Sequence, residues 1–345
     1  MGRQGASSRD VAALAGVSIG TVSNVINRPE IVAPRTRAKV EAAIQELGFV
    51  PNASARRLRG AATRTIGVIV PDVSNPFFTD LARGAEDKAN EADFLVIVCN
   101  SDESVIKEEH YLSMLEAQQV DGICITPASR TSLQKSPTFK RLMERKVGLA
   151  VMDGRLRGVD ACFATVDDVQ GGAMAAEHLL GLGHRSFLWI TGPDSIPQCY
   201  DRETGIRAAL DHAGLGSDAL TRVEVAAMSA DAGVAIGEHL LEQGLHHTAV
   251  ICANDLLAFG CLRAFLEHGI EVPGDISIVG YDDIYFARVA AVPLTSIRQP
   301  RRELGRTAAE MVLAQCIDSD AVPPREVIFQ PQLVVRESTA GPAAR

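Results

Sequence analysis

A short stretch near the N-terminus carries side chains suited to contact with a polyanion. Residues 18–27 read SIGTVSNVIN, in which Ile19, Val22, Val25 and Ile26 have helical spacing. The other positions are small or polar, where a free-standing helix would gain from Ala, Leu, Glu or Lys. Hydroxyl and amide groups of this kind hydrogen-bond to phosphates and to base edges. The residues concerned are Ser18, Gly20, Thr21, Ser23, Asn24 and Asn27.

The elements that must position this stretch are three short helices within residues 7–50. Ser7 begins a capping box, and Gly16 ends the first helix. Ser18 is the expected N-cap of the second helix, so a turn of only a few residues joins the two. Pro34 opens the third helix. A helix, a tight turn and a second helix can place the second helix in the major groove of DNA.

The charge of the chain is unevenly distributed. The net charge is -9, yet residues 1–64 hold ten basic residues against four acidic ones. A basic arm on an acidic body indicates that the arm contacts a polyanion. Residues 51–60, PNASARRLRG, add three Arg and one large apolar residue, Leu58. They form either a solvated basic linker or a segment that folds on the minor groove, with Leu58 between base steps, and the arrangement favours the second interpretation.

From residue 65 onward, apolar runs alternate with helical patterns. Near-continuous apolar runs are typical of buried parallel strands. Alternation of strand and helix over about 280 residues favours a doubly wound α/β body with two lobes. The runs are 65–70, 94–99, 121–126, 147–152, 186–191, 248–253 and 276–281.

Composition and missing motifs narrow the class of protein. Hydrophobic residues at 46% and charged residues at 22% are typical of a globular chain. Seven scattered cysteines without a CxxC pair favour a reducing, cytoplasmic setting over a disulfide or zinc framework. No signal-peptide pattern and no membrane-spanning run is found, so we expect neither export nor membrane insertion. Because GxxxxGK(S/T), GxSxG and HExxH are absent, we expect no enzyme, no catalytic residues, no cofactor and no metal.

Ordered motifs cover nearly the whole chain, from Asp10 to about Val335. They are DVAALAGVSIGTVSNVIN (10–27), VAPRTRAKVEAAIQELGFVPN (32–52), ASARRL (53–58), TIGVIVPDVSNPFF (65–78), VDGICITP (120–127), ITGPDSIPQCYDRETG (190–205), VICANDLLAFG (250–260), ISIVGYDDI (276–284) and PLTSIRQP (293–300). In this order they resemble the lactose-repressor/galactose-repressor (LacI-type) family of bacterial transcription regulators.

This resemblance implies a fold and a division into domains. The fold class is an all-α helix-turn-helix head with a hinge helix, followed by a two-lobed α/β core similar to periplasmic binding proteins, with doubly wound parallel sheets. The expected boundaries are 1–50 for the DNA-binding domain, 51–63 for the hinge helix and linker, and 64–345 for the effector-binding and dimerisation core. Within the core, lobe 1 is expected at about 64–165 plus 293–325, and lobe 2 at about 166–292 plus 326–338.

Carried over by position, the resemblance also implies which residues bind DNA. Ile19, Gly20 and Asn24 occupy base-reading positions, and because Gly20 has no side chain, base readout falls to the other two. Packing in the core is the alternative for Ile19 and the preferred interpretation for Val22. The phosphate contacts fall to Thr21, Ser23 and Asn27 and to the helix N-terminus at Ser18. The hinge adds Asn52, Ala55, Arg56 and Leu58.

A small molecule is expected between the lobes. Arg202 and Asp282 are the leading candidates, since a fork of donors and a pair of acceptors can orient vicinal hydroxyls. Simple packing remains open for Phe78, and a structural cap for Asp153. Ile196 stands where the purine-repressor branch has an Arg, which favours a sugar-like effector over a purine. The full effector-binding set is Asp72, Ser74, Asn75, Phe77, Phe78, Asp153, Gln198, Arg202, Met228, Asn254 and Asp282.

The expected protein is a homodimeric regulator that acts as a repressor at a pseudo-palindromic double-stranded operator. One recognition helix reads one half-site, so a two-fold dimer matches the operator. Two alternatives stay open: a sugar-binding protein without DNA regulation, and a regulator that responds to a purine or nucleoside.

Overall fold

Two units make up the chain, residues 1–63 and 64–345. The structure is a computed structural model that describes residues 6–49, 63–154, 156, 158–317 and 325–342. The hinge residues predicted to contact DNA, Asn52, Ala55, Arg56 and Leu58, lie outside the described residues. Within the described part of the chain, no helix is both long enough and apolar enough to cross a membrane.

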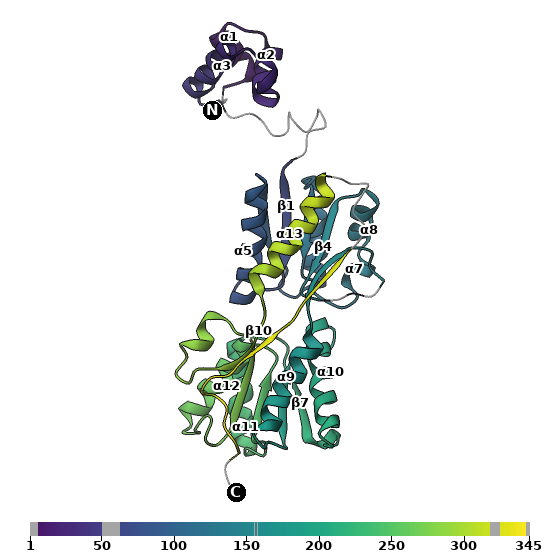
Figure 1. Ribbon diagram of the computed structural model, residues 1–345, viewed down its shortest axis with the longest axis vertical. Helices are drawn as coiled ribbons and strands as arrows, with labels where there is room; N and C mark the ends of the chain where they lie inside the picture. Colours follow the sequence, from purple (N-terminus) through teal and green to yellow (C-terminus); the bar gives the residue numbers. More distant parts are fainter. Residues whose placement is uncertain (1–5, 50–62, 155, 157, 318–324, 343–345) are drawn as a thin grey trace. The chain divides into compact units, whose positions relative to one another are not determined.

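The first unit contains the three helices that the sequence predicts (Figure 1). Ser7 and Asp10 form the predicted capping box, and Gly16 ends the first helix with a left-handed φ of 66°. Val11, Val22 and Val40, one from each helix, are completely buried and form the centre of a small core. The elements are α1 (Ser8–Ala15), α2 (Ile19–Asn27), the 3-10 turn η1 (Pro29–Ile31) and α3 (Pro34–Leu47).

The second unit contains two six-stranded sheets, one in each lobe. The strand order is β11-β5-β4-β3-β1-β2 in lobe 1 and β12-β10-β9-β8-β6-β7 in lobe 2. All pairings are parallel except that of β12 with β10. The strands are β1 (Thr65–Val70), β2 (Leu95–Asn100), β3 (Gly122–Ile125), β4 (Gly148–Met152), β5 (Cys162–Val166), β6 (Phe187–Thr191), β7 (Leu220–Glu224), β8 (Ala249–Cys252), β9 (Ser277–Asp282), β10 (Thr295–Arg298), β11 (Glu326–Phe329) and β12 (Gln332–Val334).

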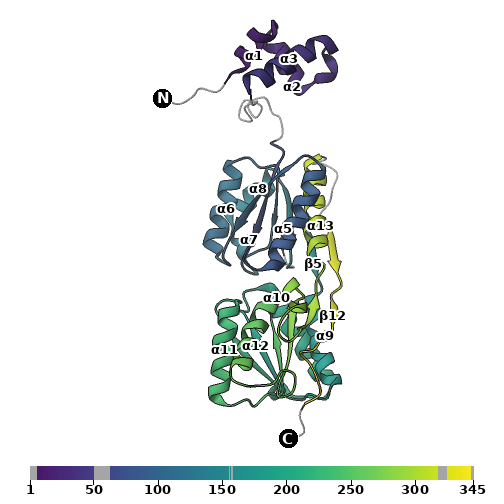
Figure 2. The same cartoon turned by 90° about the vertical axis from the view of Figure 1, so that its left-hand side faces the viewer.

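Helices cover both faces of each sheet (Figure 2). In lobe 1, Ile66 and Val68 of β1 pack toward α5 and α13, whereas Ile69 faces the core formed with α6 and α8. The helices of lobe 1 are α5 (Pro76–Glu91), α6 (Val105–Ala117), α7 (Ser132–Lys135), α8 (Pro137–Glu144) and α13 (Arg301–Ile317). Those of lobe 2 are α9 (Asp168–Gly181), α10 (Pro197–His212), α11 (Ala230–Gln243) and α12 (Asp255–Glu267), with 3-10 turns η2 (Ser217–Ala219) and η3 (Tyr285–Arg288).

The chain crosses between the lobes near residues 167, 299–300 and 330–331, which corrects part of the expected lobe boundaries. Residues 295–298 were expected in lobe 1, but β10 pairs with β9 in lobe 2. Residues 326–329 were expected in lobe 2, but β11 pairs with β5 in lobe 1. Both strands are only four residues long. The lobe that each strand joins is decided by pairing with a strand distant in sequence, and a short local pattern does not indicate that pairing.

Candidate functional site

The outward face of α2 carries the residues predicted to read bases. Ile19 is 47% exposed, which excludes the alternative that it belongs to the core. Gly20 and Asn24 are also exposed, whereas Val22 is fully buried, as expected. Thr21 and Ser23 are half-buried at the edge of this face, and Asn27 is the last residue of α2. The helix therefore separates an inner packing stripe from an outer face of small and polar groups.

The N-terminus of α2 is capped in a way that leaves hydrogen-bonding capacity for an anion. Ser18 Oγ accepts from the Thr21 backbone N–H at 3.1 Å and lies 3.0 Å from Thr21 Oγ1. Only one hydroxyl hydrogen is used between the two side chains, so the other can be donated to a phosphate. The positive end of the helix dipole and the first backbone N–H groups of α2 add to the attraction for an anion at this end.

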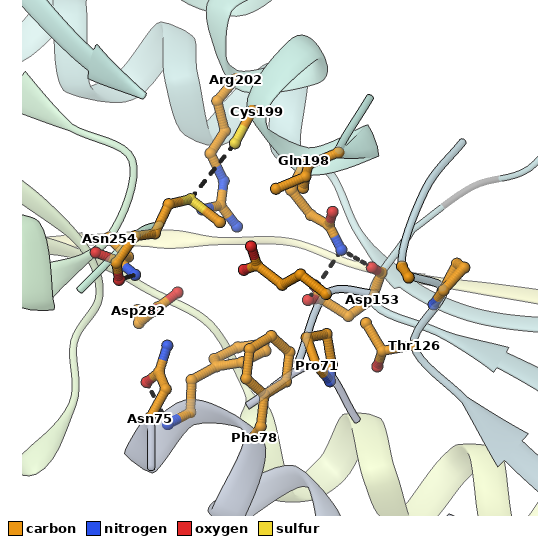
Figure 3. Close-up of a pocket in the computed structure, with 16 residues that line it drawn as sticks. Pro71, Asn75, Phe78, Thr126, Asp153, Gln198, Cys199, Arg202, Asn254 and Asp282 are labelled. Atoms are coloured by element: carbon orange, nitrogen blue, oxygen red, sulfur yellow. Dashed lines mark hydrogen bonds between the residues drawn. The ribbon is translucent and has the colours of Figure 1, made fainter. Parts of the chain in front are cut away.

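A cavity lies between the lobes at the carboxyl ends of their parallel strands (Figure 3). This is the edge at which doubly wound proteins bind ligands, because the loops there are free of strand pairing. Lobe 1 contributes residues that follow β1, β2, β3 and β4, and lobe 2 contributes residues that follow β6, β7, β8 and the end of β9. The lining residues are Pro71, Asn75, Phe77, Phe78, Glu103, Thr126, Pro127, Ala128, Asp153, Ile196, Gln198, Cys199, Arg202, Met228, Asn254 and Asp282.

Most residues of the predicted effector set line this cavity, but two do not. Asp72 and Ser74 are absent from the lining, and they bond to each other: the Ser74 backbone N–H and Oγ donate to the Asp72 carboxylate at 2.8 and 2.7 Å. This local turn satisfies both side chains. The predicted residues that do line the cavity are Asn75, Phe77, Phe78, Asp153, Gln198, Arg202, Met228, Asn254 and Asp282.

Sequence reasoning missed Glu103, Thr126 and Cys199 as lining residues. Thr126 directly follows β3, so the rule that polar residues after parallel strands meet at one edge could have found it. Glu103 lies in a turn after β2 in which both Asp102 and Glu103 have positive φ, at 51° and 54°. With this unusual backbone the Glu103 side chain lines the cavity, and no local sequence motif indicates such a turn.

Arg202 is held rigidly in the wall of the cavity. It is 5% exposed, and its Nε donates to Asp168 Oδ1 at 2.8 Å. Its guanidinium carbon lies 3.6 Å from the centre of the Tyr281 ring, and the Tyr281 hydroxyl donates to the same Asp168 oxygen at 2.9 Å. Burial opposes the charge of Arg202, but Asp168 and the other carboxylates outweigh it and raise its pKa. The guanidinium is therefore a fixed, fully charged donor.

The close approach of α9 and α10 makes this ion pair possible. A Cβ on Gly172 would come within 2.0 Å of the Arg202 carbonyl oxygen, and one on Gly205 within 1.8 Å of the Val169 carbonyl oxygen. The absence of side chains at both glycines lets the two helix backbones touch. As a result, Asp168 in the first turn of α9 reaches Arg202 on α10.

Two buried carboxyl groups face the cavity from opposite lobes. Burial raises the pKa of Asp282 to about 6, although Arg202 acts in the opposite direction. Its Oδ1 accepts from Gln299 Nε2 at 2.8 Å. Burial, followed by the charge of Asp168, raises the pKa of Asp153 well above its ordinary value. Asp153 Oδ2 lies 3.1 Å from Gln198 Nε2, whereas its Oδ1 is buried without a hydrogen-bond partner.

The remaining walls combine an amide with an aromatic face. Asn254 Oδ1 accepts from the backbone N–H of Leu257 at 2.9 Å and so caps α12, while Nδ2 donates to the Met228 carbonyl at 2.9 Å. Phe77 is 2% exposed and packs edge-on against Phe78, with ring centres 5.0 Å apart. Phe77 thus belongs mainly to the core, and the half-buried Phe78 offers its ring to the cavity (Figure 3).

The described residues offer no obvious metal centre. No group of three or more His, Cys, Asp or Glu side chains in that part of the chain is arranged to hold a metal ion. The seven cysteines are all free thiols in this structure. The cavity therefore offers hydrogen bonds, charge and an aromatic surface, which are the means of binding a small polar molecule.

Comparison with known proteins agrees with this geometry. Residues 9–52 match the family described as bacterial regulatory proteins, lacI family, and residues 176–339 match a periplasmic binding protein-like domain. The HTH-type transcriptional regulator DegA of Bacillus subtilis is 34% identical over 96% of this chain and 97% of its own. The HTH-type transcriptional repressor PurR of Vibrio atlanticus is 33% identical over 91% of this chain and 93% of its own.

Solved structures give the same result. A lac repressor dimer bound to operator and the anti-inducer ONPF has a TM-score of 0.85 and 29% identity, covering 98% of this chain and 100% of that one. A LacI family transcriptional regulator from Enterococcus faecium with bound ribose has a TM-score of 0.73 and 32% identity, covering 80% of this chain and 99% of that one.

The chain therefore belongs to the lacI family of bacterial regulatory proteins. It is a DNA-binding transcriptional regulator with a two-lobed core similar to periplasmic binding proteins, and it is not an enzyme. The fold class and family predicted from the sequence are confirmed.

Proposed function

We propose that this protein is a homodimeric repressor, acting in the cytoplasm, whose affinity for a pseudo-palindromic operator is controlled by a sugar or sugar derivative. The observation that carries the proposal is the cavity between the lobes, where Arg202 and Asp282 face Asn75, Phe78 and Asp153. Donors and acceptors from both lobes can grip one hydroxylated ring, so the ligand can change the angle between the lobes. A coupling of about 1–3 kcal/mol to DNA binding is enough for regulation.

The proposed operator contacts come from α2 and from residues 51–63. Ile19 would touch a thymine methyl, Asn24 would bond to a base edge, and Thr21 and Ser23 would donate to phosphates. The hinge would bring Asn52, Ala55, Arg56 and Leu58 to the minor groove, where an apolar side chain can kink the duplex. A Leu58→Ala protein should bind and bend the operator more weakly. If Leu58→Ala binds and bends the operator as well as the parent does, Leu58 does not act as a wedge between base steps.

Sugar recognition is favoured by the chemistry of the lining. Phe78 offers a flat apolar surface, and the carboxylates and Arg202 offer acceptors and donors at its edges. A related regulator carries bound ribose, and another similar structure is a complex of the transcriptional regulator CelR with cellobiose. We propose that the effector is an inducer, so that its binding releases the protein from the operator.

A purine or nucleoside effector is the second candidate. Its support is that several similar proteins, at 32–34% identity, are named PurR repressors. Against it stands Ile196, an apolar residue in the cavity wall that offers no hydrogen bond to a base.

Calorimetry with pentoses, hexoses, sugar acids and nucleosides separates these candidates. We expect a sugar-like ligand to bind Asp282→Asn at least about tenfold more weakly than the parent. The control is Asp211→Asn, which neutralises an exposed carboxyl on α10 and should bind the ligand as the parent does. If only a nucleobase binds tightly, the effector is a purine and the proposal of a sugar effector is wrong.

The homodimer is supported by apolar groups left exposed on both lobes. Leu95 and Val98 on the edge strand β2 are 64% and 47% exposed, and Ile106 on α6 is 85% exposed. Lobe 2 has an apolar groove between α12 and η3, lined in part by Phe259, Leu262, Leu266, Phe286 and Val289. Exposed apolar surface of this extent is typical of an interface, and a second copy of the chain would cover both patches.

Light scattering tests the dimer. Ile106→Glu should give a monomer at micromolar concentration and lower operator affinity, because each monomer reads only a half-site. Val335→Glu, at another exposed apolar position, is the control and should remain a dimer. A dimeric Ile106→Glu protein would exclude this edge from the interface.

A further inference from the structure

The charge of the effector cavity is unbalanced. Three carboxyl side chains, Glu103, Asp153 and Asp282, line it, and Arg202 is the only Lys, Arg or His among the lining residues in the described part of the chain. The guanidinium is already paired with Asp168 at 2.8 Å and also donates to the Ala253 carbonyl. Its charge is thus compensated within the wall and cannot neutralise all three carboxylates.

The hydrogen bonds of two of the three carboxyls are incomplete: Asp153 accepts one only at Oδ2, from Gln198, and Glu103 accepts none from the described residues. Asp153 is 2% exposed, and its Oδ1 has no partner in the structure. Glu103 forms no hydrogen bond or ion pair with any other described residue, and burial, followed by the charge of Asp72, raises its pKa. Asp282, by contrast, accepts a hydrogen bond from Gln299. Buried polar atoms are nearly always paired in folded proteins, so the unpaired Asp153 Oδ1 marks a place where a ligand donates.

The nearest other cation is committed elsewhere. Arg301 donates to the backbone carbonyl oxygens of Asp282 and Asp283, and its Nε pairs with Asp80 at 3.1 Å. It contacts the Asp282 backbone and leaves the side-chain carboxyl without an ionic partner in the described part of the chain. The missing positive charge must then come from the ligand or from bound protons.

We propose that the effector is a hydroxylated ring that carries a protonated amine, with the ammonium donating to Asp153 and Glu103 and the hydroxyls held by Asp282 and Arg202. This inference rests on the proposed function and makes it more specific. The ammonium supplies up to three donors, which can reach Asp153 Oδ1 and the Glu103 carboxylate, and its charge offsets the excess of acids. The Phe78 ring adds a surface that attracts a cation. The same charges disfavour a phosphorylated or carboxylated sugar.

Matched ligands that differ in one substituent test the proposal on the full-length chain. Calorimetry would compare glucosamine, galactosamine, mannosamine and 1-deoxynojirimycin with glucose, galactose and mannose, with the neutral N-acetyl hexosamines, and with the hexose 6-phosphates. At least one amine should bind about tenfold or more tightly than its neutral counterpart, because a hydrogen bond between charged groups exceeds a neutral one by about that factor. The 6-phosphates should bind most weakly.

Two variants locate the charge effect. Glu103→Gln should reduce the preference for the amine over its neutral counterpart to less than about threefold, whereas Glu86→Gln, on the exposed face of α5, should keep the full preference. Thermal denaturation of both variants checks that they are folded.

The outcomes separate this inference from the proposed function. If neutral sugars bind as tightly as the amines, or more tightly, the proposal of an amine-bearing effector is wrong, whereas the proposal of a sugar-responsive regulator still holds. Tight binding of a 6-phosphate would overturn the charge argument in the same way. Failure of every member of the set to bind would count against both proposals.

Discussion

Replacement of Asp282 by Asn tests whether the effector cavity contains a destabilising charge. Asp282 is 4% exposed, and burial raises its pKa from 3.8 to about 6 even with Arg202 nearby. A difference of about 2 pKa units at 1.36 kcal/mol each corresponds to about 3 kcal/mol of destabilisation of the native state by the ionised carboxylate. An Asn side chain keeps an acceptor oxygen for Gln299 without the charge. We therefore expect Asp282→Asn to be more stable than the parent by up to about 3 kcal/mol at pH 7.5.

The sign of the pH dependence follows from the same shift. Because the native pKa lies above the unfolded one, the native state binds more protons between pH of about 4 and 6. The contribution of Asp282 to the stability of the parent is therefore lost as the pH rises through this window. Asn does not titrate, so the advantage of Asp282→Asn should shrink toward zero as the pH falls to about 4 and be complete above about pH 7.

Urea unfolding followed by the fluorescence of Trp189 measures this difference directly. Trp189 is the single tryptophan and is fully buried in β6 of the same lobe. Asp211→Asn, at an exposed position on α10, is the matched control and should change the free energy of unfolding by less than about 0.5 kcal/mol. A less stable Asp282→Asn protein at pH 7.5, or an advantage that does not fall with acidification, would refute the reasoning.

Three further predictions concern packing in the two units. Ile19→Ala should weaken operator binding yet change the free energy of unfolding by less than about 0.5 kcal/mol, because Ile19 is exposed. Val22→Ala should destabilise the helical unit by about 2 kcal/mol, because Val22 is buried. Chemical denaturation measures the stability of both variants, and an operator titration measures their affinity. Arg202→Met leaves a buried carboxylate unpaired, so urea unfolding should show a loss of about 3–5 kcal/mol. Gly172→Ala must push α10 away and should cost about 1–3 kcal/mol in the same assay, whereas Gly181→Ala on the same helix meets open space and should cost less. Equal losses for the paired variants would contradict the packing described.

Local signals in the sequence were sufficient for the helical unit. The capping box at Ser7, the left-handed turn at Gly16 and the N-cap at Ser18 each depend on residues within four positions, so a pattern can reveal them. The apolar runs also predicted β1, β3, β4, β6, β8 and β9, whereas no run predicted β5, β7, β10, β11 or β12. The strand β2 was foreseen too, but its position at a sheet edge leaves Leu95 exposed, which the apolar run alone does not indicate.

Features that depend on distant pairing could not be read from the sequence. Nothing local distinguishes a short strand that joins lobe 1 from one that joins lobe 2, so β10 and β11 were placed in the wrong lobes. Asp72 was expected in the cavity because it follows a strand, but Ser74 satisfies it locally. Glu103 reaches the cavity only because of a backbone turn with positive φ. Residues after buried parallel strands, such as Asp153 and Asn254, were predictable because strand ends converge.

Titration of a fluorescent duplex from the region upstream of the protein's own coding sequence tests the central claim most directly. Anisotropy at low salt should show specific binding by the full-length protein and weaker binding as the salt concentration rises. Addition of the sugar-like ligand that calorimetry identifies should release the duplex. Binding that is no tighter than to an unrelated duplex, and that stays unchanged with every ligand tested, would contradict the account.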